Sequence, residues 1–329
     1  MLELSVRNDL IELLCANFTN KELIELGRLL FKNYNAHSQL GVKSHITLTA
    51  RKHAEFLVDR CESEKQTAAF IKLLVELDDR IILGKHVTIK GIEFFLHHLM
   101  QQGFTYDHRS RQILDCTSDK QELVNWGSLR DGKIYDIAVM SIDIVGNSAL
   151  VKKYGMRKME TFYYQLWAFL KEKLARYDGR LWSWAGDGGI CAFTFKSHVS
   201  RAVLFAVELQ SSIPVFNMRP GKPVQEDIQI RIGIDCGKIR FFCSTGQIVS
   251  DAVNYAAHLE KKSTEPGKIG ISEKVFKQMD KSTCAVFTEA GTFEDRTFYI
   301  TYRRLDDLFL NRPSTVSGKK TGAKRSRPA

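Results

Sequence analysis

Residues 134–148 read IYDIAVMSIDIVGNS. Most residues before Asp143 are apolar, which predicts a strand near the centre of a sheet. A carboxylate at the end of such a strand is not placed there for burial, so Asp143 needs a cationic partner. Gly146, Asn147 and Ser148 then turn the chain into a helix, whose free N–H groups suit a phosphate. The stretch therefore predicts a carboxylate and a phosphate cradle at one corner of a sheet.

A second carboxylate, Asp187, lies within residues 180–195, RLWSWAGDGGICAFTF. Glycines on both sides of Asp187 permit a tight turn between two strands, and we expect this hairpin to bring Asp187 beside Asp143. Two like charges in one pocket repel each other unless cations neutralise them, and such a pair can clamp two metal ions. An ordinary hairpin turn is the other interpretation, because Asp and Gly are preferred in turns on conformational grounds alone.

The order of elements after residue 134 predicts the fold class. A strand, a helix over 158–177, the hairpin, a helix over 199–211 and a strand over 228–235 follow one another. This βαββαβ order predicts a ferredoxin-like α+β domain, to which we assign residues 134–306.

The first 105 residues have a different pattern, that of an all-α helical bundle. Thr19 stands three residues before a glutamate and an apolar stripe, which predicts a helix start with a capping box. Residues 106–133 are polar and irregular, which predicts a linker. His97 and His98 are neighbours on a helix and point about 100° apart, so we expect them at the surface or at a boundary and not on one metal ion.

The composition is that of a globular protein with two domains: 329 residues, of which 44% are apolar and 26% charged. Five basic residues among the last eleven supply half of the net charge of +10. We expect residues 313–329 to form a disordered basic tail without a specific nucleic-acid site. Seven scattered cysteines, no secretory leader and no apolar run of roughly 18 residues indicate a cytoplasmic protein outside the membrane.

Four ordered blocks between residues 134 and 304 resemble the class III adenylyl and guanylyl cyclases. They are SIDIVGNS (141–148), AGDGGICAF (185–193), RIGIDCGKI (231–239) and SDAVNYAAHLEKKSTEPGKIGISEKVF (250–276). The resemblance implies a nucleoside triphosphate whose 3′-hydroxyl attacks its own α-phosphate and releases pyrophosphate. It also implies that Asp143, the Ile144 carbonyl and Asp187 hold two divalent ions, Mn²⁺ or Mg²⁺.

The resemblance further implies a homodimer, because the sites of this family form between two domains docked head to tail. Asn254 matches the family's asparagine that orients the ribose, and it would act from the partner subunit. His258 stands where purine cyclases have an arginine that stabilises charge on the phosphate. A histidine can supply a hydrogen bond or a positive charge there, although a lone histidine on a helix is also an ordinary structural residue.

The positions that read adenine in the family carry other residues here. Ser183 replaces a lysine and Gln247 replaces an acidic residue, and neither supplies the acidic group that guanine would require. With a tryptophan on each side of Ser183, these neutral groups favour a pyrimidine, although the tryptophans also suit a core. Tyr135 shares the parity of Asp143 on one strand, so it either contacts the base through a bend or the partner chain, or anchors the sheet edge.

A cyclase with these base positions and a helical domain resembles the bacterial pyrimidine cyclases of the Pycsar anti-phage defence system. The resemblance implies a lyase that makes cyclic UMP or cyclic CMP from UTP or CTP, and a separate effector that the product activates. The bundle resembles death-fold-like effector-associated domains in helix count and pattern, which implies regulation. An adenylate or guanylate cyclase and a catalytically silent nucleotide-binding module stay open. A GGDEF-type or polymerase-palm enzyme is disfavoured, because no acidic-aromatic pair follows AGDGG.

Overall fold

The computed structural model describes residues 2–39, 41, 43, 48–82, 85–108, 110–116 and 123–302. The predicted basic tail over 313–329 and the predicted domain end at residue 306 lie outside the described residues. The chain divides into two compact units. The first holds Met1–Tyr135, Arg180–Trp182 and Lys238–Ile248, and the second holds Asp136–Gly179, Ser183–Gly237 and Val249–Ala329.

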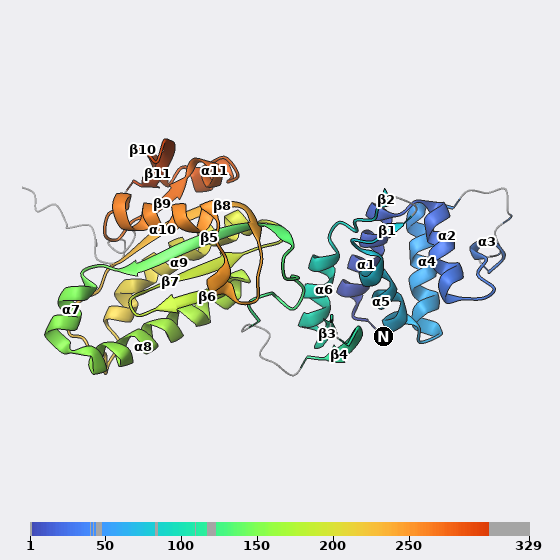
Figure 1. Ribbon diagram of the computed structural model, residues 1–329, viewed down its shortest axis with the longest axis horizontal. Coiled ribbons are helices and arrows are strands. Elements are labelled where there is room, and N and C mark those ends of the chain that lie inside the picture. The colour runs from blue at the N-terminus through green and yellow to red at the C-terminus, as the bar shows by residue number, and fades with distance from the viewer. Residues whose placement is uncertain are drawn as a thin grey trace, which may run out of the picture. The chain divides into compact units, whose positions relative to one another are not determined.

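The first unit begins with helices that share one apolar core, in which Leu10, Leu57 and Phe70 are completely buried. Thr19 caps α2 as predicted: its hydroxyl accepts a hydrogen bond from the Glu22 N–H, and the Glu22 carboxylate accepts one from the Thr19 N–H. The predicted helical bundle is therefore confirmed (Figure 1). Its helices are α1 (Leu4–Asn17), α2 (Asn20–Leu30), α3 (Ala36–Gln39), α4 (Ala50–Ser63), α5 (Thr67–Leu77) and α6 (Ile92–Gln101).

Two short hairpins accompany the bundle, β1 (Ile81–Ile82) with β2 (Lys85–His86), and β3 (Phe104–Asp107) with β4 (Gln112–Asp115). Most of the second hairpin and the completely buried Trp126 lie within residues 106–133, predicted as an irregular linker. His97 is also buried, and its Nδ1 lies 3.0 Å from the Trp126 carbonyl oxygen. The structure thus differs from both predictions, because a single large aromatic residue supplies a core that hydrophobic periodicity does not reveal.

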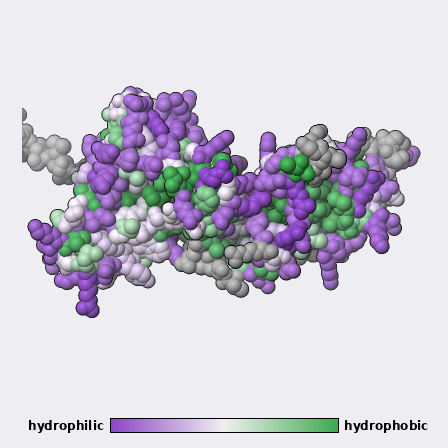
Figure 2. Space-filling model, in the orientation of Figure 1, coloured by the Kyte–Doolittle hydropathy of each residue, from purple (hydrophilic) through white to green (hydrophobic). Residues whose placement is uncertain are grey.

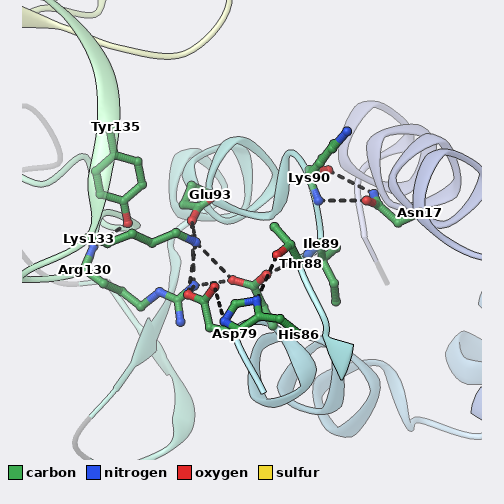
Figure 3. A network of polar contacts seen from close by, with 11 residues as sticks. Asn17, Asp79, His86, Thr88, Ile89, Lys90, Glu93, Arg130, Lys133 and Tyr135 are labelled. Carbon is green, nitrogen blue, oxygen red and sulfur yellow. Dashed lines mark hydrogen bonds and ion pairs between the residues drawn. The ribbon is translucent and has the colours of Figure 1, made fainter. Parts of the chain in front are cut away.

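A charged network joins the end of α5 and the start of α6 to residues 130–133, which precede the strand that starts at Ile134. The buried Asp78 accepts a hydrogen bond from the Ile89 N–H at 2.7 Å, and its other oxygen contacts Arg130 and Lys133. Lys133 also binds Glu93 at 2.7 Å (Figure 3). We call these residues, together with Asp79, the Asp78 network. Each charged group in it faces an opposite charge, as burial requires.

A mixed sheet organises the rest of the chain, in the strand order β10-β11-β9-β8-β5-β7-β6. The sub-order β8-β5-β7-β6 and the intervening helices confirm the predicted ferredoxin-like βαββαβ unit, and β9 to β11 extend it. The strands are β5 (Ile134–Ile144), β6 (Arg180–Ala185), β7 (Gly188–Phe193), β8 (Ile230–Arg240), β9 (Ile269–Ser272), β10 (Phe287–Phe293) and β11 (Arg296–Thr301). The helices are α7 (Asn147–Tyr154), α8 (Met156–Leu174), α9 (His198–Asn217), α10 (Asp251–Ser263), α11 (Glu273–Phe276) and α12 (Lys281–Cys284), with the 3₁₀ turns η1 (Ala175–Tyr177) and η2 (Thr245–Gln247).

The sheet has two different faces. On one face, the Phe193 ring of β7 lies 5.8 Å from the Phe205 ring of α9, and the Phe216 ring of α9 lies 5.8 Å from the Phe162 ring of α8. Because Ala138 pairs with Phe193, the even-numbered residues of β5 share this face, and its odd-numbered residues lie on the other. The second face therefore carries the carboxylate at the end of β5.

Helix α9 is long and apolar enough to cross a membrane by length and composition, and half of that window is buried inside the protein. Its phenylalanines pack on α8 and β7, so it serves as a core helix of the sheet domain. The outer surface in the view of Figure 2 is mostly hydrophilic, which agrees with this burial of apolar side chains.

Candidate active site

The ends of β5 and β7 bring the two predicted carboxylates to one edge of the sheet. Asp143 pairs with Gly188, and the Ile144 N–H donates a hydrogen bond of 3.2 Å to the Asp187 carbonyl oxygen. Gly186 turns the chain with φ +61°, and a Cβ at Gly188 would lie 2.6 Å from the Ile142 carbonyl oxygen. The AGDGG turn therefore needs its glycines for conformation and for close approach to β5.

The chain after β5 starts a helix at the predicted position. Gly146 has φ +70° and precedes α7, which begins at Asn147, and Ser148 is exposed in its first turn. The Asn147 Oδ1 accepts a hydrogen bond of 2.6 Å from the Tyr163 hydroxyl. Burial raises the pKa of Tyr163, and the negative charge of Asp187 acts in the same direction. The helix start and the Asp187 carboxylate thus belong to one local environment.

Arg231 lies at this corner, and sequence analysis did not identify it. Its Nη2 lies 2.5 Å from Asp143 Oδ2, and its Nη1 donates to the Lys261 carbonyl oxygen at 3.2 Å. The cationic partner predicted for Asp143 is therefore, in this chain, a guanidinium. A single arginine within the apolar strand IQIRIGID was the available signal, because an unpaired charge is costly at a half-buried position.

Glu260 of α10 forms a second, buried layer behind this pair. Its side chain is only 6% exposed, and its Oε1 lies 3.4 Å from Arg231 Nε. That oxygen has no hydrogen-bond partner within the described part of the chain. Burial raises the pKa of Glu260 to about 7, and the Asp143 charge adds to the shift, while Arg231 opposes it. We call Asp143, Asp187, Arg231 and Glu260 the acidic corner.

Helix α10 seats directly on β8 and presents the predicted Asn254 and His258. A Cβ at Gly233 would lie 2.2 Å from the Ala256 carbonyl oxygen, so only glycine permits this approach. The Ser250 hydroxyl caps α10 by accepting from the Val253 N–H at 3.1 Å. Asn254 and His258 are both exposed, and they lie one helical turn apart on the same side of the helix.

The sequence model of the adenylate and guanylate cyclase catalytic domain matches residues 130–297, just over half of the chain. The chain belongs to this family. Class III cyclases act on nucleoside triphosphates and use the divalent ions Mg²⁺ or Mn²⁺.

Solved structures of cyclases are similar to the chain over about half of its length. One is the guanylate cyclase domain of RhGC from Catenaria anguillulae in complex with GTP, at 20% identity, covering 52% of this chain and 99% of that chain with a TM-score of 0.44. Another is an adenylate/guanylate cyclase/hydrolase from Silicibacter pomeroyi, at 25% identity, 51% and 97% coverage and a TM-score of 0.43. A third is the adenylyl cyclase CyaB from P. aeruginosa, at 18% identity, 52% and 95% coverage and a TM-score of 0.44. No curated protein matches the chain.

Three predicted base or edge residues lie on three different elements of the chain. Ser183 is exposed on β6, within the second compact unit. Gln247 is exposed in η2 and Tyr135 opens β5, both within the first unit. The Tyr135 hydroxyl accepts a hydrogen bond from the Arg130 N–H at 3.0 Å, and burial raises its pKa to about 12. Tyr135 is thus held at the start of the strand, as the anchoring alternative expected.

The two tryptophans beside Ser183 face away from it. A Cβ at Gly189 would lie 2.4 Å from the Trp184 ring, which puts Trp184 on the sheet face of Phe193 and α9. Trp182 is buried and its Nε1 donates to the Val124 carbonyl oxygen at 3.2 Å. Strand alternation therefore leaves Ser183 on the opposite face, that of Asp143. The alternative role as a core residue holds for Trp182, whereas Trp184 is half-buried.

The acidic corner fits divalent ions through its donor chemistry. Asp143, Asp187 and the Ile144 carbonyl supply hard oxygen atoms, and Mg²⁺ characteristically takes one or two carboxylates together with phosphate oxygens of a substrate. Among the residues that the structure describes, no cluster of three His, Cys, Asp or Glu side chains forms a site by itself. The corner therefore suits ions that arrive with a triphosphate better than an all-protein metal cage.

Proposed function

We propose that the cyclase converts UTP or CTP to the 3′,5′-cyclic monophosphate and pyrophosphate. The edge that Asp143 and Asp187 share beside a helix start supports the cyclase reaction. One observation carries the choice of base: Ser183, on the face of Asp143, is exposed and neutral where adenine-selective cyclases have a lysine. Gln247 is also neutral, so neither position offers the charges that adenine or guanine would pair with.

In this reaction the ribose 3′-oxygen forms a bond to the α-phosphorus while the bond from that phosphorus to the pyrophosphate oxygen breaks. Pyrophosphate leaves with the electron pair, and the hydroxyl proton passes to solvent. Asp143, the Ile144 carbonyl and Asp187 would hold two Mn²⁺ or Mg²⁺ ions, which neutralise charge on the phosphates when bound. The protein contributes mainly position and electrostatics.

We expect Arg231 to pair with Asp143 in the free protein and with the triphosphate once metal ions bind. Its guanidinium occupies one oxygen of Asp143, so an ion that binds the same oxygen must displace it. A displaced guanidinium would remain tethered beside the corner by the Glu260 carboxylate and the Lys261 carbonyl oxygen. Because arginine matches phosphate oxygens with two parallel hydrogen bonds, we expect Arg231 to exchange Asp143 for the triphosphate.

We also propose a homodimer in which Asn254 of one protomer orients the ribose held at the acidic corner of the other. Mixing two inactive variants tests this arrangement. Asp187→Ala protomers lack a corner and Asn254→Ala protomers lack a ribose contact, but their heterodimer contains one intact site. We expect the mixture to regain a substantial share of wild-type turnover, while either variant alone stays inactive. A mixture as inactive as its components would show that each site is completed within one chain.

The base choice is tested by incubating the full chain with Mn²⁺ and each of the four nucleoside triphosphates separately. We expect a cyclic monophosphate and pyrophosphate from UTP or CTP and little product from ATP or GTP. Product from ATP or GTP alone would overturn the pyrimidine proposal and leave the cyclase assignment in place. The absence of product from every triphosphate would support a silent nucleotide-binding module.

We further propose that the product serves as an alarm signal in anti-phage defence, with the helical bundle as the regulatory part and a separate effector as the receiver. The resemblance to Pycsar cyclases supports this role. The test expresses the chain with and without an adjacent gene for a cyclic-nucleotide-binding effector during phage infection. Protection that requires both genes and is lost in Asp187→Ala supports the proposal, whereas protection by the Asp187→Ala variant contradicts it.

A further inference from the structure

The β10–β11 hairpin holds the ring of His258. The Nδ1 atom of His258 lies 2.7 Å from Glu294 Oε1. Because an ionised carboxylate only accepts hydrogen bonds, Nδ1 carries the hydrogen and donates it to Glu294. Nε2 is then the ring atom directed to a further partner, and Glu294 fixes the orientation of the ring.

Both neighbours of the hairpin tip are anchored on α10. On one side, the Phe293 ring lies 5.8 Å from the Tyr255 ring, and the Tyr255 hydroxyl donates to the Phe293 carbonyl oxygen at 3.4 Å. On the other side, Arg296 binds the Asp251 carboxylate at 2.7 Å and lies 4.7 Å from the Tyr255 ring centroid. Glu294 therefore stands between two fixed points, both of which touch the helix that carries His258.

This anchoring separates the pair from an ordinary surface ion pair. Exposed pairs contribute little because two mobile side chains lose entropy when they meet. Here the tip is a tight turn in which Glu294 has φ +49° and Asp295 φ +58°, a conformation that glycine and asparagine adopt more readily. Turn geometry does not account for a glutamate at this position, whereas a function that needs its carboxylate does.

We propose that Glu294 is a positioning residue for the cyclase reaction, and that it aims His258 Nε2 at the α-phosphate of the triphosphate bound by the partner subunit. The proposal rests on the proposed function above. His258 lies one turn beyond Asn254 on the same exposed side of α10, so both reach the same neighbour. In its imidazolium form the ring donates a hydrogen bond from Nε2 to a non-bridging phosphate oxygen, and the Glu294 carboxylate balances the positive charge of the ring. No proton is transferred by the pair.

The first test compares two substitutions in the same turn. Glu294→Ala removes the acceptor of Nδ1, and we expect kcat to fall about 10-fold or more with KM changed less than about twofold. Asp295→Asn is the matched control, because it alters the adjacent exposed acid of the turn, and its kcat should stay within about twofold of wild type. Thermal unfolding should be the same for both variants. An unchanged kcat in Glu294→Ala, or an equal loss in Asp295→Asn, would overturn the proposal.

The second test asks whether Glu294 acts through His258. An arginine keeps its charge without a neighbouring carboxylate, so in a His258→Arg background Glu294→Ala should lower kcat less than about twofold. The same loss in both backgrounds would assign Glu294 a structural role, and a completely inactive His258→Arg would exclude an arginine-like role of the ring. All four triphosphates are assayed, so an incorrect base choice does not hide the effect. Inactive wild type with every triphosphate would instead remove the proposed function itself.

Discussion

Two buried carboxylates, Asp78 and Glu260, have opposite surroundings in this molecule. The Asp78 side chain is 0% exposed, yet it has a backbone N–H on one oxygen and two cations on the other. Glu260 is almost as buried, but its Oε1 lacks a hydrogen-bond partner among the described residues, and the arginine nearest to that oxygen is shared with Asp143. A closed network of the first kind holds a fold together, whereas an open one leaves charges available for a ligand.

We expect the largest effect from Asp187→Ala, which should abolish turnover without affecting stability. Asp187→Ala removes an oxygen donor of the acidic corner, and we expect kcat to fall by about 10³-fold or more while the unfolding midpoint stays near that of wild type. The carboxylate of Asp187 has no hydrogen-bond partner in the described part of the chain, so its loss breaks no hydrogen bond. Turnover assays and denaturant unfolding of the same preparation give both quantities. Retained turnover would refute the metal assignment.

The structure makes Asp143 a less clean test than the sequence suggests. From the sequence, alanine at either position should leave the fold intact, since one of two repelling charges is removed. Arg231 changes this expectation, because Asp143→Ala also deletes an ion pair and leaves the guanidinium with Glu260. Asp143→Asn, which keeps the shape of the side chain, is therefore the better companion of Asp187→Ala.

The second effect addresses the closed network. Asp78→Ala leaves the Ile89 N–H without its acceptor and Arg130 and Lys133 without their shared oxygen. We expect the free energy of unfolding to fall by about 3 kcal/mol, the cost of breaking a buried charge pair. Asp59→Ala is the control, because Asp59 pairs with Arg7 while 61% exposed. Equal effects of the two variants in urea unfolding would contradict the importance of burial.

Only part of the acidic corner could be predicted from the sequence. Asp143 and Asp187 could be predicted, because an apolar strand end and a glycine-flanked turn are local patterns. The pairing of Asp143 with Arg231 joins residues 88 positions apart and depends on the register between β5 and β8. No local pattern encodes that register, and the burial of Glu260 depends on how α10 seats on Gly233.

In the first unit, too, local features could be predicted and other features could not. Thr19 and its capping partner were predicted, since a helix start is encoded within four residues. The hairpin of β3 and β4 was not, because strands of four residues are too short for a clear alternation. Trp126 gave no periodic signal either, although it is completely buried.

The third effect uses pH to test the open cluster. Burial raises the pKa of Glu260 from an ordinary 4.5 to about 7, so the folded protein holds a proton that the unfolded chain releases earlier. Its stabilising contribution is complete below about pH 4.5 and is lost as pH rises through about 7. In the metal-free protein, wild type should lose up to about 3 kcal/mol relative to Glu260→Gln across this range. A pH-independent difference between the two would show that Glu260 stays ionised.

The smallest effect tests the redundancy of the Asp78 network. Lys133→Gln removes one of the two cations on Asp78, but Arg130 and the Ile89 N–H remain, so we expect a loss of only about 1 kcal/mol. The matched control is Lys72→Gln, because the Lys72 side chain is 45% exposed and its ammonium lies 3.8 Å from Glu76; this variant should change stability by less than about 0.5 kcal/mol. If Lys133→Gln destabilised the protein as much as Asp78→Ala, each contact of the network would be indispensable. The stability of the Asp78 network would then depend on every one of its contacts. The number of partners around a buried carboxylate would not distinguish this network from the acidic corner.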